Sequence, residues 1–170
     1  MTQDTSHLSG RVGLFLTTLL GLAALMVAPL TAIAPPAEAA GIILTTNGDG
    51  TGYGEAGGRI TFPSRYKVKI VEPWANDYCG PRGGDGRGVY MRGKATTRSG
   101  TGKWRKHRLG LIAYDNNGCG STPMRFDTRR WTKSSKIVYV ELWLCEENHS
   151  ASGTKCLRRS SIKTYRNPHQ

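Results

Sequence analysis

The sequence predicts an all-β protein: a small antiparallel β-sandwich, immunoglobulin-like in a coarse sense, or a barrel, with two disulfides after a cleaved signal peptide. Three observations support this fold class. Beyond the N-terminal apolar run, no long stretch repeats its apolar residues with the helical period. Short runs that alternate apolar and polar residues recur instead, separated by turns rich in Gly and Asn. The same part of the chain contains all four cysteines.

Residues 1–39 have the order of a secretory signal peptide. A polar start with a single basic residue precedes an uncharged apolar run from Val12 to Ala28, and an Ala-Glu-Ala triplet ends at Ala39. We therefore expect cleavage after Ala39 and a secreted, extracellular protein with no further membrane span. An uncleaved membrane anchor is the alternative, because the apolar run is near the lower length limit for crossing a bilayer.

The secreted part is strongly basic. The whole chain has 24 Lys and Arg against 12 Asp and Glu, and only one of these bases and two of these acids precede Ala40. The remaining 131 residues therefore carry a net charge of +13, and their number suits one domain. We expect a Gly-rich N-terminal segment at 40–58 and a single disulfide-stabilised β domain at 59–170.

The Gly-rich segment opens with a short strand, Ile42–Thr46. The glycines of residues 47–54 favour a turn or loop. This stretch begins like a calcium-binding loop, with oxygen ligands at alternate positions and Gly at the sixth. Gly58 occupies the twelfth position, where such a loop needs a bidentate Glu, so we predict a turn and no metal site.

Alternating patterns predict the remaining strands in order, and consecutive strands usually pair. They lie at 66–70, 89–97, 104–114, 124–131 and 137–145, with Cys156–Tyr165 as the returning strand. Pro73 is expected to end the first strand, and a loop at 76–88 follows. Leu109, Leu111 and Ala113 are expected on one face of their strand. The strand at 137–145 has apolar residues on both faces, which predicts a central position.

The cysteines predict a disulfide framework. Cysteines are even in number and follow a signal peptide, and the outside of a cell is oxidising. Of the three possible connectivities we favour Cys145–Cys156, across a hairpin, together with Cys79–Cys119. No C-x-x-C pair occurs and the histidines are scattered, so we expect neither a metal nor a cofactor.

Basic residues beside aromatic ones form three clusters, and they are the candidate binding residues. The clusters contain Lys103, Trp104, Arg105, Lys106 and Arg108; Arg129, Arg130 and Trp131; and Arg158 and Arg159. Cationic side chains attract phosphates, and neighbouring aromatic rings can stack on bases or sugars. Solvent-exposed strand faces also need charged residues, so the clusters alone do not establish a ligand. Our first hypothesis is a basic, non-enzymatic protein that binds an anionic polymer or surface, such as a cell-wall polymer or nucleic acid.

Two other function classes remain open. A protease inhibitor or antagonistic effector could act through a disulfide-bounded loop, either 118–124 beside Cys119 or 146–155. A nuclease could pair His107 with His149 or Glu147 as acid and base, although nothing in the spacing favours that pairing. No G-x-S-x-G motif occurs and the cysteines are expected to be oxidised, so we assign no catalytic residue.

Overall fold

The structure is a computed structural model that describes residues 39–46, 52–81, 83–84, 86–148 and 156–170. The predicted signal peptide therefore lies outside the described residues, apart from Ala39. The first strand begins at Ala40, so cleavage after Ala39 would leave every described strand intact. Within the described part of the chain, no helix is long and apolar enough to cross a membrane.

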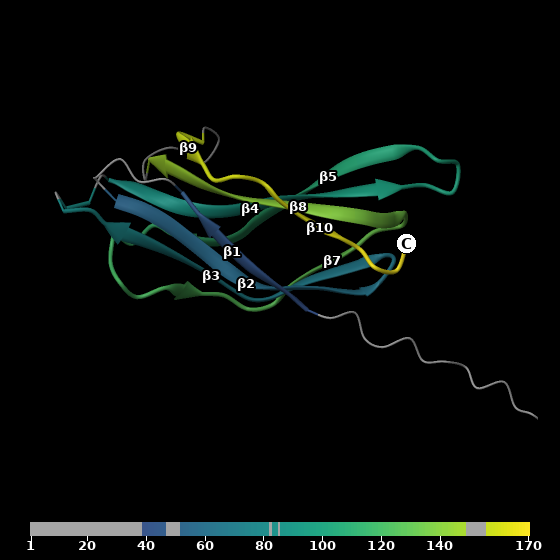
Figure 1. The fold of residues 1–170 in the computed structure, drawn as a ribbon, viewed down its shortest axis with the longest axis horizontal. Helices are drawn as coiled ribbons and strands as arrows, with labels where there is room; N and C mark the ends of the chain where they lie inside the picture. Colours follow the sequence, from purple (N-terminus) through teal and green to yellow (C-terminus); the bar gives the residue numbers. More distant parts are fainter. Residues whose placement is uncertain (1–38, 47–51, 82, 85, 149–155) are drawn as a thin grey trace, which may run out of the picture. The chain divides into compact units, whose positions relative to one another are not determined.

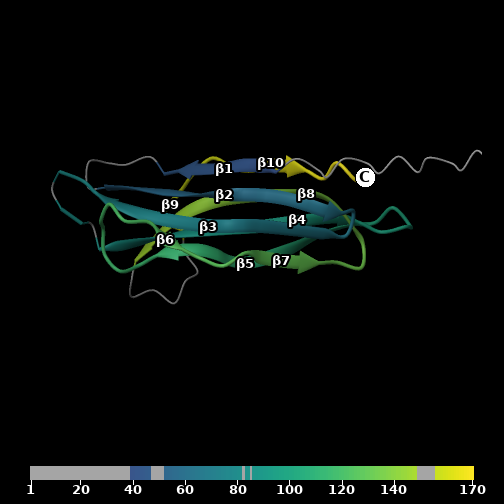
Figure 2. The same ribbon diagram turned by 90° about the horizontal axis from the view of Figure 1, so that it is seen from below.

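Two antiparallel sheets pack face to face as a sandwich, which confirms the predicted fold class (Figure 1). Sheet 1 contains β1 (Ala40–Thr45), β2 (Gly52–Ser64) and β3 (Lys67–Cys79), and both β6 (Met124–Arg125) and β7 (Arg129–Thr132) pair with β3. Sheet 2 has the order β10 (Lys163–Arg166), β8 (Lys136–Asn148), β4 (Arg87–Arg98) and β5 (Trp104–Asp115), with β9 (Arg158–Arg159) also paired with β8. The second view shows β8 between its neighbours, as predicted for a central strand (Figure 2).

The core lies between the two sheets and is mainly aliphatic. Its largest fully buried side chains are Ile42, Leu44, Ile60, Val68, Ile70, Val89, Met91, Ile112, Ile137, Val140, Leu142 and Leu144. Gly54 allows the sheets to approach closely near one end, since a Cβ atom there would lie 2.5 Å from the Val89 side chain of the opposite sheet.

Side chains bridge the sheets along both edges of the sandwich. On one edge, the Trp131 Nε1–H of β7 donates to the Leu109 carbonyl of β5 at 3.1 Å, and the Arg129 Nε–H donates to the Ile112 carbonyl at 3.3 Å. On the other edge, the Tyr165 hydroxyl of β10 donates to the Gly41 carbonyl of β1 at 3.3 Å. These bonds satisfy edge carbonyls that would otherwise be open to another chain.

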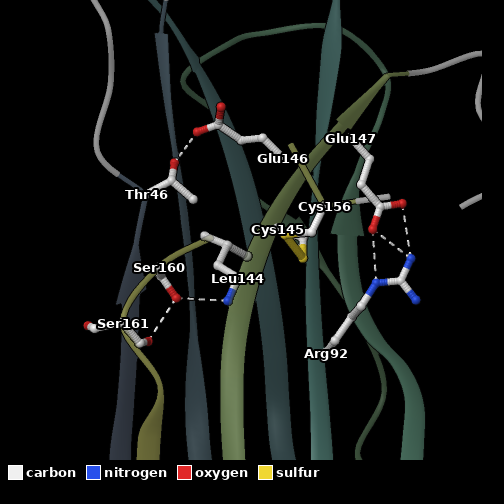
Figure 3. Close-up of a disulfide and its surroundings, with 9 residues drawn as sticks. All are labelled: Thr46, Arg92, Leu144, Cys145, Glu146, Glu147, Cys156, Ser160 and Ser161. Atoms are coloured by element: carbon white, nitrogen blue, oxygen red, sulfur yellow. Dashed lines mark hydrogen bonds and ion pairs between the residues drawn. A yellow bond between two sulfur atoms is a disulfide. The ribbon is translucent and has the colours of Figure 1, made fainter. Parts of the chain in front are cut away.

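Both favoured disulfides are confirmed. Cys79–Cys119 joins the end of β3 to the loop after β5, and Cys145–Cys156 joins β8 to the segment before β9. The adjacent residue Glu146 points between the sheets, where its carboxylate accepts a hydrogen bond from the Thr46 hydroxyl (Figure 3). Arg87 lies 3.7 Å from the same carboxylate, so this buried acid has a cationic neighbour.

Pro73 does not end its strand, contrary to the sequence-based expectation. β3 continues to Cys79, and β2 begins at Gly52, inside the stretch assigned to a turn. The β2–β3 register shifts between Gly57 and Arg59, so Glu72 and Pro73 form a bulge in β3 opposite Gly58, where no ladder donor is needed. Glu72 takes a positive φ of 48° at this bulge.

Three other details differ from the predicted pattern. Leu111 is 40% exposed, because register shifts in the β4–β5 ladder reverse the alternation of β5 between Leu109 and Ala113. The strand expected at 124–131 consists of two short strands, β6 and β7, and the returning strand consists of β9 and β10. In the last two cases the chain leaves the ladder between two short strands, which local alternation does not reveal.

Candidate functional site

Basic side chains from β4, β5 and β9 share the outer face of sheet 2. These basic residues alternate along their strands with buried residues such as Met91, Ala95 and Leu109. Because successive side chains of a strand point to opposite faces, the basic side chains point away from the core. We call this surface the cationic face and define it by Arg92, Lys94, Arg98, Lys106, Arg108 and Arg159.

The cationic face includes only part of the predicted set. Trp104, Lys106, Arg108 and Arg159 belong to this surface; Trp104 is 55% exposed and lies 5.5 Å from the Arg98 guanidinium. Lys103 lies in the β4–β5 turn, and Arg105 alternates to the opposite face of β5. The side chain of Arg158 lies outside the described part.

The second predicted cluster belongs to a different sheet. Arg129 and Trp131 of β7 bind edge carbonyls of β5, and Trp131 packs against the core. Arg130 lies on the outer face of sheet 1, directly across from Lys69. The structure therefore does not bring this cluster together with the other two.

Trp143 of β8 lies at the centre of the cationic face and was not among the predicted binding residues. Lys94 Nζ lies 5.6 Å from the centre of its ring and Arg159 Cζ lies 4.5 Å from it. The two cations come from opposite sides of β8, because β4 and β9 flank that strand. Cations at these distances are attracted by the negative face of an indole ring.

A hollow of about 380 Å³ lies beside Trp143. It is lined by Arg92, Gly93, Lys94, Arg108, Gly110, Trp143, Cys145, Glu147 and Cys156. Gly93 and Gly110 pair across β4 and β5, and a Cβ atom at Gly93 would lie 2.6 Å from the core side chain of Leu142. Gly110 has a φ of +77°, and nothing lies within 4 Å of the position that its Cβ would occupy.

One carboxylate, Glu147, lines the hollow and is held by Arg92. The Arg92 Nε–H donates to Glu147 Oε1 and its Nη2–H donates to Oε2, both at 3.0 Å (Figure 3). The side chain of Glu147 is only 3% exposed, and that of Arg92 is 28% exposed. This bidentate pair neutralises the buried acid and fixes the Arg92 side chain.

The other cations of the cationic face lack a bidentate partner among the described residues. Lys106 forms an ion pair with Glu141 at 3.6 Å. No carboxylate of the described residues lies within ion-pair distance of Lys94 and Arg108, which line the hollow, or of Arg159. Lys94 faces Arg108 directly in the β4–β5 ladder, a like-charge arrangement that is destabilising by itself. On its other side Lys94 faces Glu141 in the β4–β8 ladder, whose carboxylate is ion-paired with Lys106. An anion bound between Lys94 and Arg108 would relieve the repulsion between these two cations.

Lys94, Arg92 and Trp143 are missing from the predicted set for different reasons. Arg92 and Lys94 alternate with core residues, a pattern that indicates an exposed face but not the neighbouring strands. Trp143 lies in an apolar run whose two faces look equally buried. Only the β4–β8 pairing, which sets Arg92 opposite Trp143, joins them.

A second hollow, of about 600 Å³, lies near β6 and β7. It is lined by Glu72, Arg125, Phe126, Asp127 and Arg129, two acids and two bases with one aromatic residue. Its balanced charge makes it a weaker anion site than the smaller hollow on sheet 2.

The acid–base pair of the nuclease hypothesis is not brought together. His107 pairs with Ala95 and is hydrogen-bonded to the Thr97 hydroxyl at 3.0 Å, whereas Glu147 pairs with Gly88. Ala95 and Gly88 are seven residues apart in β4, which corresponds to roughly 23 Å. His149 lies outside the described residues.

Two observations concern metal and inhibitor chemistry. In the described ranges, no group of three or more His, Cys, Asp or Glu side chains is placed to hold a metal ion. Of the two loops considered for protease inhibition, residues 149–155 lie outside the described part, and residues 118–124 are described.

Comparison of the chain with protein-family models, with curated proteins and with solved structures found no match.

Proposed function

We propose that this protein is a secreted, basic, non-enzymatic β-sandwich that binds an anionic polymer or surface through the cationic face. The supporting observation is the position of Lys94 and Arg159 beside one indole, with Arg108 directly across the ladder from Lys94. None of these three cations is ion-paired with a carboxylate of the described residues. Holding like charges together costs free energy, which a polyanion would offset by replacing repulsion with attraction.

The extracellular location supports this proposal and is itself an expectation. The order of residues 1–39 is that of an export signal, and both disulfides are of the kind that persists in oxidising compartments. Polyanions outside a cell include wall polymers, membrane surfaces and released nucleic acid. A net charge of +13 would favour contact with each of them.

Retention on immobilised polymers in a salt gradient tests the proposal. The purified protein would be compared on cell-wall polymer, RNA and heparin with an unrelated protein of similar charge. Substituting Lys94, Arg108 and Arg159 by Gln should lower retention and reduce the salt slope by about two units, because each contacted phosphate contributes roughly −0.7 to −0.9.

A matched variant supplies the control. Lys67→Gln, Lys69→Gln and Arg130→Gln remove the same charge from the outer face of sheet 1. This variant should retain the wild-type salt slope within about half a unit. Equal losses in both variants would show that retention reflects total charge, and the proposal would then fail.

One observation favours a second candidate, a protease inhibitor. The 118–124 loop is tethered by Cys79–Cys119, its Gly120 N–H donates to the Asp77 carbonyl at 2.7 Å, and the Asn76 amide donates to the Gly120 carbonyl at 3.3 Å. A loop held at its base loses little entropy on binding. Incubation with a panel of secreted proteases would test this alternative, and full activity of every protease would remove it.

A further inference from the structure

The hollow beside Trp143 combines three kinds of chemistry within one site. It has a pair of cations without carboxylate partners among the described residues, one wall formed by an indole, and one buried carboxylate. A site built for any polyanion would need only the cations. The indole and the buried carboxylate therefore indicate which class of anionic ligand the hollow would bind.

The cation pair is arranged for a single anionic group. Lys94 and Arg108 are direct cross-strand neighbours, whose Cβ atoms are about 5 Å apart in an antiparallel ladder. Their long side chains can converge on one sulfate, phosphate or carboxylate, and the Arg fork adds two donors. The open space at Gly110 leaves room for this group.

The indole wall favours a ring beside that anion. Lys94 and Arg159 lie 5.6 and 4.5 Å from the ring centre, so their charged groups are no more than about 10 Å apart across the indole. A sugar ring with acidic substituents can contact the indole and both cations.

The carboxylate favours a ligand that also carries hydroxyl groups. Arg92 engages both oxygens of Glu147, but a carboxylate has about four lone-pair positions, so it can accept further hydrogen bonds. Sugar hydroxyls are donors, whereas phosphodiester oxygens are acceptors only, so a DNA backbone offers this carboxylate no hydrogen bond. This difference separates an acidic glycan from a DNA backbone.

We propose that the hollow binds an acidic glycan, with one anionic substituent between Lys94 and Arg108 and the sugar ring against Trp143. This inference rests on the proposed function and narrows its ligand to one class. Arg159 holds a second anionic group on the far side of the indole. Arg92 and Glu147 act as a fixed pair whose carboxylate receives ring hydroxyls.

The test is a calorimetric and fluorescence titration of the protein, expressed as the full chain in an exporting host and purified. The probes are a sulfated tetrasaccharide, a phosphorylated one, a uronic-acid one, a neutral one and an oligodeoxythymidylate of matched charge. We expect at least one acidic saccharide to bind about 10-fold or more tightly than the oligonucleotide, and the neutral saccharide not to bind. The three acidic probes show which substituent the cation pair accepts.

Variants locate the binding. Lys94→Gln and Arg108→Gln should each weaken acidic saccharide binding roughly 5- to 20-fold, as expected for hydrogen bonds to a charged group. Lys69→Gln and Arg130→Gln, the corresponding cross-strand pair on sheet 1, should change it by less than about twofold. Trp143→Phe, which retains an aromatic ring, should remove most of the ligand-induced fluorescence change.

The outcomes separate this inference from the proposed function. Equal affinity for saccharide and oligonucleotide, with Lys94 still required, would overturn the glycan assignment and leave polyanion binding in place. Equal effects of Lys94→Gln and Lys69→Gln, with polymer retention intact, would overturn the hollow as the site. Retention no better than that of a charge-matched protein would overturn both proposals.

Discussion

The outer faces of the two sheets contain similar residue types but differ in how these residues are arranged. Each has a cross-strand Lys–Arg pair, Lys69–Arg130 on sheet 1 and Lys94–Arg108 on sheet 2. Each also has a Trp on a strand with neighbours on both sides, Trp74 on β3 and Trp143 on β8.

The two tryptophans differ in what covers them. A Cβ atom at Gly57 would lie 2.6 Å from the Trp74 ring, so that indole lies directly on the backbone of β2. Trp143 is instead flanked by Lys94 and Arg159 and forms a wall of the hollow. The comparison teaches that composition alone does not make a site: the neighbours decide whether a Trp fills a gap in its own sheet or borders a space that a ligand can enter.

The two disulfides provide the largest expected effects and test this comparison. Removing Cys79–Cys119 by double Ala substitution should lower the free energy of unfolding by roughly 4 kcal/mol, and removing Cys145–Cys156 by roughly 3 kcal/mol, because the closed loops span 40 and 11 residues. Denaturant unfolding would measure both values.

Polymer retention should show the opposite order. Cys145–Cys156 lines the hollow and anchors the segment that carries Arg159, so its loss should weaken retention more than the loss of Cys79–Cys119. Both variants would be measured under conditions where they remain folded. If the Cys79–Cys119 variant loses as much retention, the hollow on sheet 2 has no special part in binding.

The next largest difference between the two sheets should be the loss of stability when a carboxylate that pairs with Arg is removed. Glu147→Gln should lower the free energy of unfolding by about 3 kcal/mol, because it removes one member of a buried, bidentate ion pair. Glu72→Gln on sheet 1 breaks an exposed 3.6 Å contact with Arg59 and should cost less than about 0.5 kcal/mol. Similar values for both in urea unfolding would contradict the difference in burial between these pairs.

Alkaline pH should produce the smallest effect, and it concerns sheet 2. Burial, and after it the charge of Glu147, raises the pKa of Tyr90 above its usual value of 10.0. Burial likewise raises the pKa of Tyr165. A raised folded-state pKa keeps the phenol neutral, so the resulting stability is fully present below pH 10.0 and is lost as the pH rises through the folded-state pKa.

Thermal unfolding at several alkaline pH values would measure this loss. Tyr90→Phe should make the free energy of unfolding less sensitive to pH between roughly pH 9 and 11, since phenylalanine does not ionise. Tyr66→Phe, at a 38% exposed position in the turn between β2 and β3, is the control. An unchanged pH dependence in Tyr90→Phe would show that this phenol does not contribute.

The sequence by itself determined the class of the fold and its covalent framework. Period-two alternation and Gly/Asn turns are local properties, so they located the strands around Val89, Leu109 and Leu142 without knowledge of their partners. The confirmed disulfides followed from the even cysteine count and the expected hairpin near Cys145. The basic surplus was equally plain from composition.

Only the tertiary structure decided which basic residues act together. A strand has two faces, and its partners and bulges determine which face is buried: register shifts turned Leu111 outward, and the bulge at Pro73 let β3 continue. The cationic face joins Lys94 to Trp143 and Arg159, residues far apart in the chain, through the pairing of β4, β8 and β9. Such long-range pairing depends on the packing of the whole core, so no local pattern in the sequence encodes it.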